Sequence, residues 1–104
     1  GVHLPRAFEL HQNYPNPFNP HTTIAFTISD DAVGEDGLAD VMLAVFDLRG
    51  REVSELINGN LPPGQHEFIW QGTDLDGNAA GAGVYFFLLR IDGKSFIRKS
   101  VLLP

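Results

Sequence analysis

Apolar and polar residues alternate along the first clearly patterned stretch of the chain, residues 22–29. Ile24, Phe26 and Ile28 are separated there by small or polar residues. This period of two, with β-branched side chains, predicts a strand with one buried face. Residues 40–47 are apolar at both alternating sets of positions, which predicts a central strand.

Further strands are predicted where short apolar runs lie between turn-forming residues. These strands are 51–57, 65–70, 84–91 and 94–103, and the most apolar is 84–91. Turn or loop residues occupy the segments 30–40, 48–50, 58–64, 72–83 and 92–93. About six or seven short strands, without any helical pattern, predict an all-β fold. We expect an immunoglobulin-like antiparallel β-sandwich of about seven strands.

The segment Asn13–Pro20, with the sequence NYPNPFNP, fits neither a helix nor an ordinary strand. Each proline fixes its own φ angle, lacks an N–H donor and restricts the residue before it. The asparagines are expected to bond to their own backbone in turns. We therefore predict a stiff crossing that leads into the strand at Thr22, blunts a sheet edge and is anchored on the sandwich by Tyr14 and Phe18.

The composition is that of one globular domain. The chain has 104 residues, of which 43% are hydrophobic and 19% are charged, and this excludes a disordered chain. It has no cysteine, so a disulfide scaffold and a cysteine zinc site are excluded. Seven basic and 13 acidic residues give a net charge of −6, which disfavours nucleic acid and anionic membranes as partners.

The chain is divided into two unequal parts by its pattern. Residues 1–9 are mixed in character and are interpreted as a linker remnant, and residues 10–104 as the domain. We expect this chain to be part of a longer protein. No apolar run approaches the roughly 20 residues that a membrane-spanning helix needs, so membrane insertion is not expected.

No arrangement of reactive side chains indicates catalysis. The histidines are dispersed without metal-ligand spacing, and they are His3, His11, His21 and His66. The serines lie in or beside predicted strands, and the nucleophile motif G-x-S-x-G is absent from the sequence. We expect neither an enzyme nor a bound cofactor.

Two acidic segments leave a calcium site open as an alternative. Residues 74–78, DLDGN, resemble the start of a calcium loop but lack its later ligands. A tight Asp-Gly turn is the favoured interpretation. The clustered carboxylates of loop 30–40 could hold Ca²⁺, but a solvated loop is favoured.

Two single residues have both a structural and a functional interpretation. Trp70 alternates with Phe68 and His66 at the end of a strand, which favours the core, whereas an exposed Trp could stack on a sugar ring. Lys99 lies between apolar neighbours in the last strand, where an outward lysine discourages edge-to-edge association. Arg98 is expected to point to the opposite face.

Several motifs, in their order and spacing, resemble those of one family. NYPNPFNP is followed by TTI, by RGREV, and then by WQGTDLDGN and GVYFFLL. The residues that carry the match are Asn13, Pro15, Asn16, Pro17, Phe18, Trp70, Gly72, Asp74 and Gly77. From about Leu10 onward, the chain resembles the type A C-terminal sorting domain of proteins exported by the type IX (Por) secretion system. It is also similar to the immunoglobulin-like module of the flagellar hook-capping family.

The resemblance implies a non-catalytic targeting domain at the C-terminus of a larger secreted protein, with the cargo domain before it in the chain. Its partners would be the outer-membrane translocon of a Gram-negative bacterium and the cell-surface attachment machinery, and its location the cell surface or the medium. In the family pattern, Gly83, Tyr85 and Lys99 fall on the positions most associated with the signal. The terminal hairpin, 84–103, is the expected recognition element, because strand edges are natural docking templates.

Two features depart from the family pattern. The acidic loop 30–40 is longer than expected, and few residues follow the last predicted strand. Two alternatives remain open: a structural spacer that is retained in the mature protein, and a carbohydrate-binding module that uses Trp70.

Overall fold

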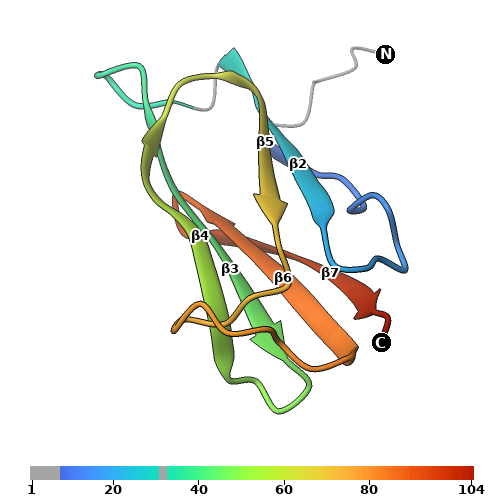
Figure 1. Cartoon of the computed structure of the whole chain (residues 1–104). Helices are drawn as coiled ribbons and strands as arrows, with labels where there is room; N and C mark the ends of the chain where they lie inside the picture. Colours follow the sequence, from blue (N-terminus) through green and yellow to red (C-terminus); the bar gives the residue numbers. More distant parts are fainter. Residues whose placement is uncertain (1–7, 31–32) are drawn as a thin grey trace.

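The computed structural model describes residues 8–30 and 33–104. Seven strands form two antiparallel sheets (Figure 1). The strands are β1 (Phe8–Leu10), β2 (Thr22–Ile28), β3 (Ala39–Asp47), β4 (Glu52–Leu61), β5 (Gly64–Trp70), β6 (Gly83–Ile91) and β7 (Lys94–Leu102). In the described ranges no helix is long and apolar enough to cross a membrane.

The two sheets differ in size. The smaller sheet has the strand order β1-β2-β5, and the larger sheet has the order β4-β3-β6-β7. This confirms the all-β, immunoglobulin-like sandwich that the sequence predicts. The apolar strand β3 lies between β4 and β6, which confirms the prediction of a central strand there.

The core is formed largely by every second side chain of strands such as β2, β3 and β6. In β2 the buried positions alternate strictly with half-buried ones, and in β6 Phe87 and Leu89 are fully buried. Phe26 of β2 and Leu43 of β3 are also fully buried. Burial of each such side chain contributes roughly 1.5–3 kcal/mol, so this alternating set fixes which face of each sheet points inward.

Trp70 is at the centre of an aromatic cluster in this core. Its ring centroid lies 5.6 Å from that of Phe18, 5.0 Å from that of Tyr85 and 6.0 Å from that of Phe87. Its Nε1–H donates a hydrogen bond of 2.9 Å to the carbonyl of Thr73, and only 1% of the residue is exposed. The core interpretation of Trp70 is therefore confirmed, and the side chain is not accessible to a sugar ring.

The observed strands depart from the sequence-based boundaries in two places. Residues 58–61 continue β4, although NGNLPPG indicates a turn there, because Asn58 and Gly59 pair with Met42 and Val41 of β3. Pairing with a central strand outweighs the weak β-propensity of asparagine and glycine.

The other departure is at the start of the domain. Phe8 and Glu9, which fall in the segment interpreted as a linker remnant, form β1 with Leu10 and pair with β2. The ring of Phe8 is buried and packs against Phe96 of β7 with a centroid distance of 6.3 Å. Residues 1–7 of the same segment lie outside the described residues.

The segment 13–20, which we call the clasp, crosses from the smaller sheet to the edge of β7. Phe18 forms a parallel bridge with β7: its N–H donates to the carbonyl of Val101 (2.9 Å), and its carbonyl accepts from the N–H of Leu103 (2.9 Å). The carboxamide oxygen of Asn16 accepts from the N–H of Val101 (3.2 Å). The clasp therefore occupies the edge of β7 from about 101 to 103, and this part of the edge is not free for another strand.

A buried polar network holds the clasp in place. The Asn13 Nδ2 group donates to the hydroxyl oxygens of Ser100 (2.7 Å) and Thr22 (2.9 Å), and the Ser100 hydroxyl donates to Asn16 Oδ1 (2.9 Å). Asn13, Thr22 and Ser100 are each at most 2% exposed. The expectation that these asparagines bond to their own turn is correct only for a weaker bond of Asn13 to Pro15 O (3.3 Å). The stronger bonds of Asn13 and Asn16 reach β2 and β7, and Asn19 Nδ2 donates to the carbonyl of Pro104 (3.1 Å).

The two aromatic residues of the clasp behave differently. Phe18 is 1% exposed and anchors the clasp beside Trp70, as predicted. Tyr14 is 81% exposed, so its prediction as an anchor is wrong. The backbone of Tyr14 exchanges two hydrogen bonds with Thr23, and this pairing turns its side chain away from the sandwich. The peptide bonds before the three prolines of the segment are cis.

Candidate recognition surface

The three residues that the family pattern associates with a signal lie on the hairpin of β6 and β7. Gly83 and Tyr85 begin β6, and Lys99 lies in β7, an edge strand of the larger sheet. Tyr85 pairs with Ser100, and Phe86 pairs with Lys99, so Tyr85 and Lys99 belong to adjacent rows that point to opposite faces. The structure brings the three residues into one hairpin but not onto one surface.

Gly83 has a backbone role at the start of β6. Its φ angle is 146°, in the region that L side chains rarely adopt. No atom lies within 4 Å of the position that a Cβ would take. The backbone conformation, and not a lack of space, therefore requires glycine at this position.

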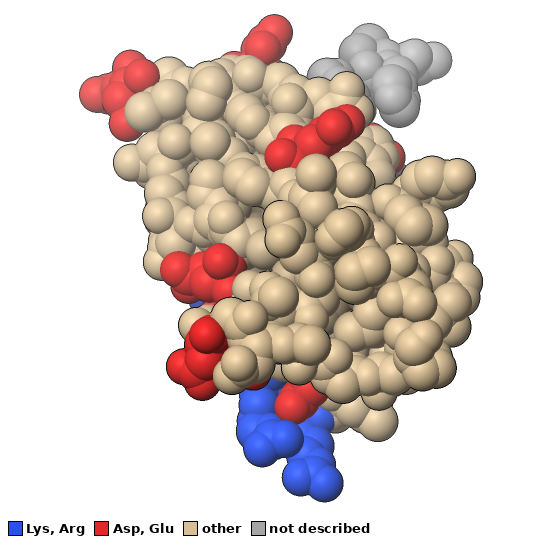
Figure 2. All heavy atoms as spheres, in the orientation of Figure 1, with Lys and Arg blue, Asp and Glu red and all other residues tan. Residues whose placement is uncertain are grey.

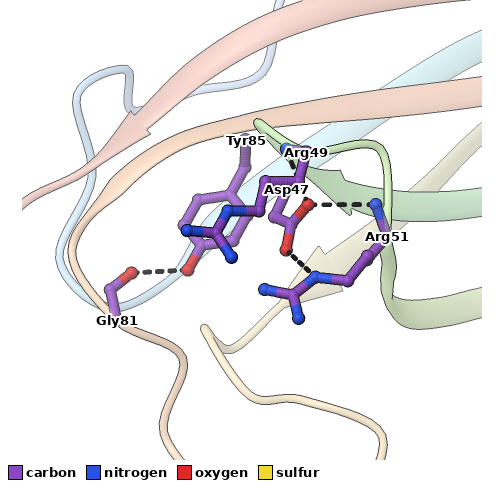
Figure 3. Close-up of polar contacts among 5 residues, drawn as sticks. All are labelled: Asp47, Arg49, Arg51, Gly81 and Tyr85. Carbon is purple, nitrogen blue, oxygen red and sulfur yellow. Dashed lines mark hydrogen bonds and ion pairs between the residues drawn. The ribbon is translucent and has the colours of Figure 1, made fainter.

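Tyr85 points into the core. It is 7% exposed, and its hydroxyl donates a hydrogen bond of 2.5 Å to the carbonyl of Gly81 (Figure 3). Burial raises the pKa of Tyr85, and the Asp47 carboxylate raises that pKa further. Tyr85 is therefore neutral in the folded protein and connects the segment before β6 to the core.

The RGREV motif forms the turn between β3 and β4. The Asp47 carboxylate accepts hydrogen bonds from the backbone N–H groups of Arg49 (2.9 Å) and Arg51 (3.0 Å) and from the Arg51 guanidinium (3.2 Å; Figure 3). The bond from the Arg51 N–H is the largest effect on the pKa of Asp47, which is lowered although desolvation opposes this. Figure 2 shows basic side chains at the lower end of the molecule, where Figure 1 places this turn. The Asp47 carboxylate thus holds the shape of the turn through these three hydrogen bonds.

The WQGTDLDGN motif is a tight turn, as the sequence favours. Asp74 Oδ1 accepts hydrogen bonds from the N–H groups of Asp76 (3.0 Å) and Asn78 (2.9 Å), and Gly77 N–H donates to the Asp74 carbonyl (3.0 Å). The Asp74 side chain is thus used by the turn itself.

Gly72 of the same motif lies against the clasp. Its φ angle is 72°, and a Cβ there would come within 2.9 Å of the carbonyl oxygen of Pro20. A side chain would therefore be strained and would also push the end of the clasp away from the turn. The motifs NYPNPFNP and WQGTDLDGN meet at this contact.

A pocket of about 440 Å³ lies between the β3–β4 turn and residues 74–81. Its polar side chains include Asp47, Asp74 and Tyr85, which bond to backbone groups of the neighbouring turns. Among residues 8–30 and 33–104, no group of three or more His, Cys, Asp and Glu side chains is placed to hold a metal ion. Loop 30–40 includes residues 31–32, which lie outside the described ranges.

Lys99 is exposed on the outer face of the larger sheet. Its neighbour Arg98 points to the other side, where its Nε–H donates to the carbonyl of Leu10 in β1 (3.2 Å). This agrees with the expectation that the two side chains diverge. Lys99 is therefore the one of the three signal candidates whose side chain another protein can reach.

The sequence pattern did not predict the surface on which Lys99 lies. Beside it, a groove of about 340 Å³ is lined mainly by large apolar side chains on the outer face of the larger sheet, which are Phe46, Leu48, Phe86, Leu88 and Ile97. Leu48 is 71% exposed and Ile97 is 58% exposed. The sequence feature that could have indicated this apolar face lies in residues 84–91, which are apolar at both alternating sets of positions. In a two-layer sandwich, only one of those sets can lie in the core.

Comparison with known proteins gives a family for most of this chain. Residues 22–92 match the family model of the FlgD Ig-like domain. No curated protein sequence matches the chain.

Solved structures with a similar fold come from proteins of different kinds. Latent PorU from Porphyromonas gingivalis aligns with a TM-score of 0.71 at 18% identity, over 92% of this chain and 9% of PorU. PorZ from the same organism, described as an essential surface component of the type IX secretion system, aligns with a TM-score of 0.58 at 21% identity, over 93% of this chain and 11% of PorZ.

A third similar structure is the DNA glycosylase AlkC from Pseudomonas fluorescens. It aligns with a TM-score of 0.58 at 14% identity, over 97% of this chain and 32% of AlkC. At these identities the likeness shows the fold alone. The chain spans about a tenth of the length of PorU and PorZ and about a third of AlkC, so this fold occurs as one module within longer proteins of unrelated activity.

Proposed function

The chain belongs to the FlgD Ig-like domain family, and on that premise we propose that it is a non-catalytic, type A C-terminal sorting domain. It directs a larger secreted protein through the type IX secretion system. Its partners are the outer-membrane translocon and the cell-surface attachment machinery, and its cargo domain precedes it in the same chain. The exported protein resides at the cell surface or in the medium, and the sorting domain needs no cofactor.

Support for this proposal comes from the motifs and from the fold. The order NYPNPFNP, WQGTDLDGN and GVYFFLL resembles that of the sorting domains. The same fold is found in PorZ, which is itself a surface component of a type IX secretion system. Neither observation alone assigns the role, since the fold also occurs in AlkC.

The observation that carries the proposal is the exposed Lys99 beside an apolar groove on the terminal hairpin. A recognition site needs accessible side chains, and a large exposed apolar patch is typical of a protein-binding surface. Gly83 and Tyr85 have a different role on this proposal. They hold β6 and the aromatic core in shape, so they present the hairpin to the translocon without touching it.

A secretion assay tests the proposal. A signal peptide and a fluorescent reporter are fused before residues 1–104, and surface and medium fluorescence are compared between a type IX-competent host and the same host without its translocon. We expect export that depends on the translocon. Retention of a folded, protease-resistant fusion in the periplasm of the competent host would refute the sorting function.

Point variants then locate the contact. Lys99→Ala is expected to reduce export, whereas Arg90→Ala, an exposed basic residue on the same hairpin, leaves it unchanged. Both variants keep β7, unlike a deletion of residues 94–104, which would remove an edge strand and the partner of the clasp. Equal export of the two variants would show that Lys99 is not the contact.

A structural spacer is the second candidate function. Family membership supports it directly, because the FlgD Ig-like module resembles this chain over residues 22–92. The test is mass spectrometry of the mature secreted protein: a spacer is retained, and a cleaved sorting domain is missing. The carbohydrate-binding alternative depended on Trp70, which is buried, and we do not propose it.

A further inference from the structure

The outer face of the larger sheet carries one cross-strand row with an unusual order of side chains. Phe46 of β3 pairs with Glu52 of β4 on one side and with Phe86 of β6 on the other, and Phe86 pairs with Lys99 of β7. Across the four strands the row therefore reads acid, phenylalanine, phenylalanine, base. The two charged residues are exposed, and the two phenylalanines are half-buried.

Such a row is complementary to itself. A two-fold axis that runs parallel to the strands, between β3 and β6, exchanges the two halves of the row. It places Phe46 of one copy on Phe86 of the other, and Glu52 on Lys99, twice in each pair of copies. Sheets that pack face to face lie about 10 Å apart, a spacing that lets opposed phenylalanine rings touch.

The next row is compatible with the same arrangement. Ala44 of β3, which is fully buried, pairs with Leu88 of β6, and Leu88 pairs with Ile97 of β7. Glu55 pairs with Ala44 at the other edge of the row. The same axis opposes Glu55 of one copy to Ile97 of the other, so this row contains no like-charged pair.

The charges at the two ends of the row have no partner within one copy. In residues 8–30 and 33–104, the ion pairs are those of Glu9 with His11 and of Asp47 with Arg51. Glu52 and Lys99 belong to neither. The two charges are exposed, unpaired and opposite in sign, and each lies one strand outside the apolar pair. This pattern is typical of an interface in which charge pairs determine which partner binds and in which orientation.

We propose that this face is the interface of an isologous dimer of the chain, built on the row Glu52–Phe46–Phe86–Lys99. This inference goes beyond the proposed sorting function and does not depend on it. In the dimer the side chain of Lys99 is covered, so a dimeric chain cannot present Lys99 to another protein.

Sedimentation equilibrium of the purified chain tests the proposal. We expect a reversible monomer–dimer equilibrium. Lys99→Glu and Glu52→Lys each turn both symmetric contacts from attraction to repulsion, which is expected to weaken the dimer by about tenfold or more. Glu67→Lys, on the exposed outer face of the smaller sheet, makes the same charge change as Glu52→Lys and leaves the equilibrium unchanged.

A mixture of the two reversed variants gives the sharpest test. When Lys99→Glu and Glu52→Lys chains are combined, both contacts of the mixed dimer are again between opposite charges, so association returns to the level of the unmodified chain. Circular dichroism confirms that each variant is folded. A chain that stays monomeric at every concentration, single reversals without effect, or a mixture that does not associate would each overturn the proposal. All of these measurements are made without a secretion host, so they stand apart from the export assay.

Discussion

The outer faces of the two sheets are both open to solvent in one copy of the chain, yet their side chains differ in kind. On the smaller sheet, alternate positions carry Thr23, Ala25 and Thr27 in β2 and Gln65, Glu67 and one exposed large apolar residue, Ile69, in β5. The larger sheet carries the groove of Phe46, Leu48, Phe86, Leu88 and Ile97. A face that meets only water is normally polar, so the difference separates a solvent face from a binding face on one small domain.

Both faces lie over one shared core, and Trp70 is the residue that tests this most strongly. Trp70→Ala removes the ring at the centre of the aromatic cluster and should lower the free energy of unfolding by about 3–5 kcal/mol. Chemical denaturation monitored by circular dichroism measures the loss. A loss of unfolding free energy below about 1 kcal/mol would be close to that of a surface substitution. Such a result would mean that the sheets do not share this core.

The clasp is the next largest expected effect, because it connects the smaller sheet to the edge of the larger one. Asn13→Ala leaves the buried hydroxyls of Ser100 and Thr22 without their amide donor, and we expect a loss of about 1–3 kcal/mol. Tyr14→Ala, at the exposed neighbouring position, is the matched control and should change stability by less than about 0.5 kcal/mol. Equal effects of the two variants would show that the buried network does not stabilise the clasp.

Gly83→Ala tests whether Gly83, at the start of the apolar hairpin, shapes the backbone or contacts a second copy of the chain. The φ angle of 146° makes any side chain strained, at a cost of about 1–3 kcal/mol. The midpoint of thermal unfolding should fall, while the dimer equilibrium of the folded variant should stay the same. A variant of unchanged stability that no longer associates would instead make Gly83 a contact residue.

The pH dependence of stability sharpens the assignment of Tyr85 to the core. Burial raises the pKa of this phenol above its ordinary value of about 10. The buried neutral phenol therefore contributes its full stabilisation of the folded state at pH values below about 10. This stabilisation is lost as the pH rises through the higher folded-state pKa. We expect stability to fall in alkaline solution and to fall less steeply in Tyr85→Phe, which at neutral pH loses only the bond to Gly81, about 1 kcal/mol. Identical alkaline slopes would count against a buried Tyr85.

The smallest effect on stability is expected from exchanging the character of the two faces. Ile97→Thr makes the apolar face more polar, and Thr23→Ile makes the polar face more apolar, and each should change the free energy of unfolding by less than about 0.5 kcal/mol. Retention on a hydrophobic-interaction column should decrease for the first and increase for the second. Changes in the opposite direction would mean that the faces have been assigned the wrong way round.

Periodic patterns predicted the parts of the fold in which local sequence and tertiary structure agree. The strands β2, β3 and β6 follow directly from alternating or continuous apolar residues. β1 is three residues long, too short to show a period. Asn58 and Gly59 extend β4 only because the neighbouring strand β3 pairs with them. The local sequence does not indicate which strand will lie beside it.

The candidate surface was less accessible to sequence reasoning. Lys99 could be placed in the last strand, but the far end of its row, in β4, could not, because the register between β3 and β4 shifts between Leu43 and Ala44 and between Val45 and Phe46. Such irregularities depend on how the strands meet. The same limit explains Tyr14 and Phe18: both are aromatic, and only the path of the clasp decides which one is buried.

The clasp also sets an order in time. Asn13 and Ser100 are 87 positions apart in sequence, yet their side chains are bonded in the buried network. A ribosome synthesises the chain from its N-terminus at about 5–20 residues per second, so β2 and most of the larger sheet exist before this contact can form. Until β7 emerges, Asn13 lacks its bond to Ser100, and the edge of β6 lacks its neighbouring strand. The domain can therefore complete its fold only after residue 103 has been synthesised.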